Sequence, residues 1–119
     1  MENLTLQEEE AMIAIWKCGR GSIKAILEHF ADQHVPYTTF ASTLKNLQKK
    51  SFIGYKQHGN VYEYFPIVKE EDYKTAFMKG VVKNYFENSY KELVSFFAEE
   101  KKISAEELKE IINMIEDKK

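Results

Sequence analysis

The sequence predicts a mainly α-helical protein with one small β-hairpin. Apolar residues recur at helical spacing over most of its 119 residues. Only residues 52–65 read as short strands, because they are rich in aromatic and β-branched residues and are interrupted by a glycine. A hydrophobic fraction of 44% with only five glycines and two prolines is typical of a globular chain and excludes low-complexity classes.

Two helices are predicted at the N-terminus. The first covers residues 6–18, where Thr5 and Glu8 have the spacing of a capping box. The second covers residues 23–33, with Ser22 as its N-cap. Their apolar faces consist of Met12, Ile15 and Trp16 in the first helix and of Ile23, Ile26, Leu27 and Phe30 in the second.

A third helix and a hairpin follow. The helix is predicted over residues 37–50, after the break that Pro36 imposes on the chain. Strands are predicted over 52–57 and 61–65, joined through Gly59-Asn60, a dipeptide favoured in tight hairpin turns. Three helices followed by a hairpin is the order of a winged helix-turn-helix, so we assign residues 1–68 to such a domain.

Residues 69–119 are predicted to form a three-helix dimerisation domain, with helices over about 70–87, 90–100 and 105–117. So small a unit buries little of its surface, yet it holds about half of the aromatic residues. A two-fold homodimer would cover them; the alternative is that they pack on the N-terminal domain. The residues expected at the dimer contact are Tyr73, Phe77, Val81, Tyr85, Phe86, Leu93, Phe96, Phe97, Leu108, Ile111 and Ile112.

Little in the sequence indicates chemistry. Cys18 is the single cysteine, and the three histidines lack metal-ligand spacing, so no metal or cofactor is expected. The adjacent carboxylates Glu8, Glu9 and Glu10 are interpreted as a solvated, capped helix turn rather than an acid–base pair. A nucleophilic Cys18 with a histidine is the weakest hypothesis, and we predict no enzyme activity. With no signal peptide or membrane span evident, a cytoplasmic location is expected.

A basic stretch lies in the middle of the chain, although the net charge is −2. Residues 34–62 contain four lysines and no carboxylate. The predicted helix 37–50 is small, polar and basic on its surface, as a helix must be to read the major groove. Helix capping by the threonines and a merely solvated lysine face are the alternative interpretations. The expected DNA contacts are Thr38, Thr39, Ser42, Lys45, Asn46, Lys49 and Lys50 on the helix, and Lys56, His58 and Asn60 on the wing.

Several motifs, in this order and spacing, resemble the penicillinase repressor (BlaI/MecI/CopY-like) family. They are Leu4-Thr5-x-x-Glu8-x-x-x-Met12-x-x-Ile15-Trp16, Tyr37-Thr38-Thr39-x-x-x-Thr43-Leu44-x-x-Leu47-x-x-Lys50, Phe52-Ile53, Gly59-x-x-Tyr62-x-Tyr64-x-Pro66, Leu93-Val94-x-Phe96-Phe97 and Ile103-Ser104-x-x-Glu107-Leu108.

The resemblance implies a homodimeric transcriptional repressor that binds a palindromic DNA operator of an antibiotic-resistance-type operon. It also implies release when a membrane sensor protease, or a protease it activates, cuts the second C-terminal helix. Phe96-Phe97 stands where the staphylococcal-type cut has Asn-Phe, so release by proteolysis or by a ligand stays open. The C-terminal cysteine cluster of the copper-responsive branch is absent.

The alternative function is a winged-helix protein-interaction module that does not bind DNA. DNA binding predicts an affinity that falls with salt. If Lys45, Lys49, Lys50 and Lys56 of two subunits all contact phosphates, the log–log slope should be about −7.

Overall fold

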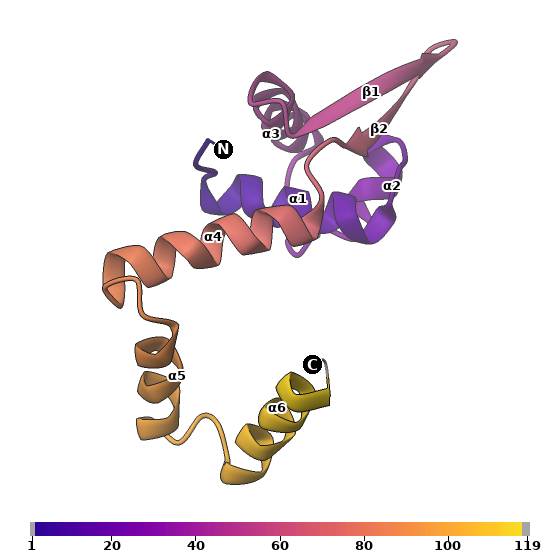
Figure 1. The fold of residues 1–119 in the computed structure, drawn as a ribbon. Coiled ribbons are helices and arrows are strands. Elements are labelled where there is room, and N and C mark those ends of the chain that lie inside the picture. The colour runs from indigo at the N-terminus through magenta and orange to yellow at the C-terminus, as the bar shows by residue number, and fades with distance from the viewer. Residues whose placement is uncertain (1, 118–119) are drawn as a thin grey trace. The chain divides into compact units, whose positions relative to one another are not determined.

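The structure, a computed structural model, describes residues 2–117 and divides the chain into two compact units, Met1–Ala76 and Phe77–Lys119 (Figure 1). The chain is mainly helical with one two-stranded antiparallel sheet, which confirms the predicted fold class. The elements are α1 (Leu6–Cys18), α2 (Ile23–Leu27), α3 (Tyr37–Lys49), β1 (Ile53–His58), β2 (Val61–Pro66), α4 (Glu70–Tyr85), α5 (Tyr90–Glu99) and α6 (Ala105–Asp117).

The helix α1 begins where the sequence predicts. Thr5 Oγ1 accepts a hydrogen bond from the Glu8 backbone N–H at 3.1 Å, and Glu8 Oε1 accepts one from the Thr5 N–H at 2.8 Å. This reciprocal pair satisfies two N–H groups that the first turn leaves open. Gly19 ends the helix at φ 84°, a backbone conformation that favours glycine.

The helix α2 is shorter than predicted, because it ends at Leu27 rather than near residue 33. Tighter i to i−3 hydrogen bonds follow it, from the Phe30 N–H to the Leu27 carbonyl at 3.1 Å for example. Gln33 Nε2 then donates to the carbonyls of Leu27 and Phe30. Phe30 is nevertheless buried. The apolar spacing therefore predicts the burial of Phe30 correctly, although the helix ends before this residue.

The core of the first unit joins α1, α2, α3 and the hairpin. Phe40 is fully buried and meets Phe30 edge to face, with ring centroids 4.8 Å apart. Because α3 packs against both α1 and β1, its apolar face is fixed on two sides. The buried hydrophobic residues of this core are Ala11, Met12, Ala14, Ile15, Ile26, Phe30, Phe40, Leu44, Leu47, Phe52, Ile53 and Tyr64.

The hairpin pairs β1 and β2 from Ile53↔Pro66 to His58↔Val61, which leaves Gly59 and Asn60 as the predicted turn. Gly59 adopts φ 61°, which suits a glycine at this tight turn. Gly21 forms an isolated antiparallel bridge to β2. Its N–H donates to the Tyr64 carbonyl at 3.0 Å, and its carbonyl accepts from the Tyr64 N–H at 2.7 Å. The hairpin is therefore tied to the start of α2.

Tyr73 corrects one sequence-based assignment, because it packs within the first unit rather than waiting for a partner chain. The centroid of its ring lies 5.8 Å from that of Trp16 and 5.9 Å from that of Phe52. Its hydroxyl donates a hydrogen bond to Glu9, and Trp16 Nε1 donates to the Val68 carbonyl at 3.0 Å. For Tyr73 these contacts agree with the alternative interpretation, packing on the N-terminal part.

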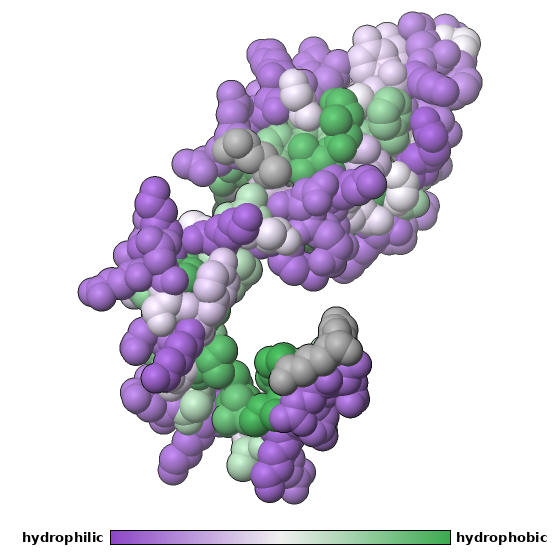
Figure 2. Space-filling view, viewed as in Figure 1, coloured by the Kyte–Doolittle hydropathy of each residue, from purple (hydrophilic) through white to green (hydrophobic). Residues whose placement is uncertain are grey.

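The second unit has a different character. Within α5 and α6, as the structure describes them, no side chain is buried. Figure 2 shows hydrophobic residues gathered over these two helices. Ser104 and Glu107 form the predicted capping box at the start of α6, so local sequence signals position the helix while its apolar stripe stays uncovered.

Candidate nucleic-acid interface

The exposed side of α3 carries six of the predicted DNA contacts. Positions i, i+4, i+7 and i+11 fall on one side of a helix, and two further residues lie directly beside that row. All six side chains are exposed, whereas Phe40, Leu44 and Leu47 on the opposite side are buried. We call the exposed set the α3 outer face; it consists of Thr38, Thr39, Ser42, Lys45, Asn46 and Lys49.

The threonines at the start of α3 do not cap it. Pro36 is the N-cap residue, and no side chain makes a cap hydrogen bond to this helix. Thr38 and Thr39 are exposed residues of the first turn. The capping interpretation of these two residues is therefore not supported.

The hairpin places two of the predicted wing residues on one face and the third at its tip. Because side chains alternate along a strand, Lys56, paired with Glu63, and His58, paired with Val61, lie on one face. Tyr55, Tyr62 and Tyr64 lie on the other, and they line a cleft with Lys45, Gln48 and Lys49 of α3. Asn60 is exposed in the turn at the tip. Sequence reasoning missed this tyrosine face, although the alternation in β2 was a signal for it.

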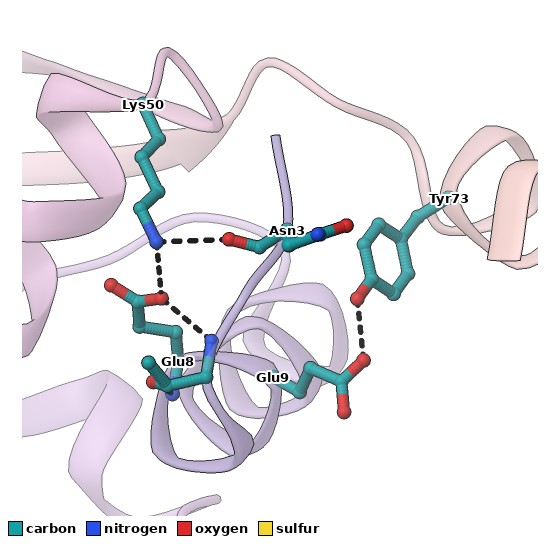
Figure 3. Close-up of polar contacts among 6 residues, drawn as sticks. Asn3, Glu8, Glu9, Lys50 and Tyr73 are labelled. Atoms are coloured by element: carbon teal, nitrogen blue, oxygen red, sulfur yellow. Dashed lines mark hydrogen bonds and ion pairs between the residues drawn. The ribbon is translucent and has the colours of Figure 1, made fainter. Parts of the chain in front are cut away.

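Lys50 differs from the other predicted DNA contacts. Its Nζ lies 2.7 Å from Glu8 Oε1 and 3.0 Å from the Asn3 carbonyl, and only 25% of its side chain is exposed (Figure 3). Its charge is thus committed to an internal ion pair. The predicted solvated turn of Glu8 to Glu10 is corrected with it, because Glu8 is buried and Glu9 accepts the Tyr73 hydrogen bond.

Two acidic residues of the first unit are paired with cations. Glu8 pairs with Lys50, and Glu63 pairs with Arg20 at 3.0 Å and lies 3.5 Å from His58 Nε2. Arg20 also lies over the Phe65 ring at 4.9 Å from its centroid. The α3 outer face itself carries Lys45 and Lys49 and no carboxylate, so it presents donors and positive charge to a polyanion.

Comparison with known proteins identifies the family. The penicillinase repressor family model matches residues 4–117. The chain belongs to the penicillinase repressor family. The resemblance that the motifs indicated is therefore confirmed, and the match extends across both units.

Individual members and one solved structure agree with this assignment. The methicillin resistance regulatory protein MecI of Mammaliicoccus sciuri is 28% identical over 99% of this chain and 100% of its own length. The penicillinase repressor of Bacillus licheniformis is 24% identical over 94% of this chain and 88% of its own length. The solution structure of the DNA binding domain of the repressor BlaI superposes on 61% of this chain and 94% of its own, with 25% identity and a TM-score of 0.52.

Other kinds of site are not evident in residues 2–117. No group of three or more His, Cys, Asp or Glu side chains there could hold a metal ion. Cys18 Sγ lies 3.5 Å from the Arg20 carbonyl oxygen, to which it donates a hydrogen bond. None of the helices in this range has the length and apolar composition that crossing a bilayer requires. The family is a regulatory one.

Proposed function

We propose that this penicillinase repressor family member is a transcriptional repressor that binds operator DNA as a homodimer, with α3 in the major groove. The observation that carries the proposal is the α3 outer face, which is free of carboxylates and held from behind by the buried Phe40, Leu44 and Leu47. A reading helix needs a rigid mount as well as polar side chains, and this one has both.

The residues of the α3 outer face divide into two roles. Thr38, Thr39 and Ser42 lie in the first half of the helix, where recognition helices contact base edges, and Asn46 follows them one turn on. Lys45 and Lys49 serve as phosphate contacts. On the wing, we assign Lys56 and His58, which lie on the face opposite the tyrosines, and Asn60 at the tip to contacts with flanking backbone. Lys50 is left out of this set because it holds Glu8.

The exposed apolar surface of the second unit supports the homodimer. In the single chain Phe77 is 53% exposed, Phe96 46% and Ile112 50%. A second copy of the same unit would remove this surface from water at about 25 cal/mol per Å². The proposed dimer contact comprises Phe77, Val81, Tyr85, Phe86, Leu93, Phe96, Phe97, Leu108, Ile111 and Ile112. Two α3 helices would then meet half-sites about one helical turn apart.

Binding at several salt concentrations to a duplex enriched from a random-sequence pool, and to a scrambled duplex of equal length, tests the function. With Lys45, Lys49 and Lys56 of two subunits, we expect a log–log slope of about −5, shallower than the −7 that includes Lys50. The enriched sequence should be palindromic. A slope near zero on both duplexes would instead favour a protein-interaction module.

Replacing Lys49 tests the assignment of phosphate contacts. Lys49→Gln should weaken binding to the enriched and scrambled duplexes about equally and make the salt slope less steep by about 2, since two phosphate contacts disappear per dimer. Lys17→Gln on α1 is the control, because it removes the same charge from an exposed site outside α3. A slope that changes as much for Lys17→Gln as for Lys49→Gln would contradict the assignment.

Release by a membrane sensor protease, or by a protease it activates, stays a prediction of the family resemblance. The bond between Phe96 and Phe97 lies inside the last turn of α5, which ends at Glu99. A protease that cuts there has to open the helix first, because proteases bind extended chain.

A further inference from the structure

The strongest unassigned feature is a cleft of about 360 Å³ between α3 and the hairpin. It is lined by Lys45, Gln48 and Lys49 from α3 and by Tyr55, Tyr62 and Tyr64 from the hairpin. All six residues belong to the first unit, in which β1 packs directly on α3 (Figure 1). The cleft is therefore a fixed feature of the DNA-binding half.

The tyrosines form one connected aromatic wall. The Tyr55 ring lies 5.0 Å from the Tyr62 ring, edge to face, and 6.0 Å from the Tyr64 ring. Tyr64 is buried, but Tyr55 and Tyr62 remain 45% and 43% exposed. Two half-exposed tyrosine rings beside a buried one indicate a surface that binds a ligand.

The chemistry of the lining suits a sugar–phosphate strand. The two ammonium groups, the Gln48 amide and the phenol hydroxyls all supply hydrogen-bond donors, and no carboxylate lines the cleft. The ring faces offer apolar contact for a deoxyribose. A purely electrostatic site would not require the aromatic rings, and a pocket of the hydrophobic core would not contain the lysines.

The position of the cleft decides which ligand it takes. Lys45 and Lys49 belong both to the cleft and to the α3 outer face, so the cleft continues the surface that we assign to the major groove. A duplex that takes α3 into its major groove brings the backbone strand at the edge of that groove to the cleft.

We propose that the cleft seats one sugar–phosphate strand of the operator, with the Tyr55 and Tyr62 hydroxyls donating to its phosphates. This inference rests on the proposed function and adds Gln48, Tyr55 and Tyr62 to the DNA contacts. Because phosphates are the same in every sequence, these residues contribute affinity and register rather than base preference.

The test uses the full chain with Tyr55→Phe, Tyr62→Phe and the double substitution, which keep the rings and remove the hydroxyls. Each single change removes one hydrogen bond to a charged phosphate from each subunit, so it should weaken binding by the dimer about 10²-fold. The loss should be equal on the enriched and scrambled duplexes, and the salt slope should stay at the wild-type value, unlike that of Lys49→Gln. Tyr90→Phe on α5, a 56% exposed tyrosine of the second unit, is the control.

Neutralising single phosphates as methylphosphonates gives the second measurement. One or two positions should weaken wild-type binding more than they weaken binding by the double variant, because the double variant has already lost the tyrosine contacts there and keeps only those of Lys45 and Lys49. Wild-type affinity in the double variant, or additive losses at every phosphate, would overturn the strand seat while leaving DNA binding intact. A wild-type chain that binds no DNA would overturn both proposals.

Discussion

A chain carrying Ile112→Asp is expected to be monomeric and to bind the palindromic duplex about 10²–10⁴-fold more weakly than the wild type, because bivalent binding is lost. Ile112 is half exposed in the single chain, so the carboxylate costs little there. In a dimer contact the same carboxylate would lose its water without gaining a partner, which is strongly unfavourable.

The measurements are sedimentation equilibrium for the oligomeric state and fluorescence anisotropy for duplex binding. Asn113→Asp is the matched control, since it adds the same charge to the next position of α6 on its polar side. The thermal unfolding of the first unit should be unchanged in both variants. If Ile112→Asp remained dimeric with wild-type affinity, the proposed contact through α6 would be wrong.

Local signals made most of the fold predictable from the sequence. The Thr5–Glu8 and Ser104–Glu107 capping boxes act within four residues, and they fix the starts of α1 and α6. The Gly59-Asn60 turn likewise sets the hairpin register. The end of α2 was not predictable in this way, because the side chain of Gln33 competes for the carbonyls of Leu27 and Phe30.

Long-range contacts explain what sequence reasoning missed. Tyr73 was assigned to the dimer because the aromatic content predicts that the ring is buried. The content does not predict which residues bury it. Its partners Glu9 and Trp16 are about 60 residues away in the chain. In the sequence Lys50 is indistinguishable from its neighbour Lys49. Only the fold shows that Lys50 forms an ion pair with Glu8, which lies 42 residues earlier in the chain.

The Lys50–Glu8 ion pair is expected to contribute strongly to stability. Lys50→Met should lower the free energy of unfolding by about 2–4 kcal/mol at neutral pH. Removing one partner of a buried pair leaves the other charge without compensation, which typically costs about 3–5 kcal/mol. The side chain of Glu8 is only 5% exposed, whereas that of Lys50 is 25% exposed, so a value toward the lower end is expected. Because Lys50 also holds the Asn3 carbonyl, the chain before α1 should loosen (Figure 3).

Urea unfolding monitored by Trp16 fluorescence measures this change. Lys74→Met is the matched control, since the Lys74–Glu71 pair has a similar distance of 3.2 Å but side chains 63% and 80% exposed. An exposed pair of this kind contributes about 0–1 kcal/mol. The double variant Glu8→Gln with Lys50→Met should recover part of the loss, because no buried charge remains.

The pH dependence separates a lost charge pair from lost packing. Burial raises the pKa of Glu8, but the Lys50 ammonium and the Thr5 N–H outweigh it and hold the pKa below its ordinary value. Glu8 therefore stabilises the wild type above the unfolded-state pKa, and this contribution disappears as pH falls through the folded-state pKa. Without Lys50, the two largest contributions that lower the pKa of Glu8 besides the Thr5 hydrogen bonds are gone, so its folded-state pKa rises while burial still acts on it. The deficit of Lys50→Met should then shrink as the pH falls and Glu8 becomes protonated. A deficit that is constant with pH would assign the loss to packing of the lysine stem instead.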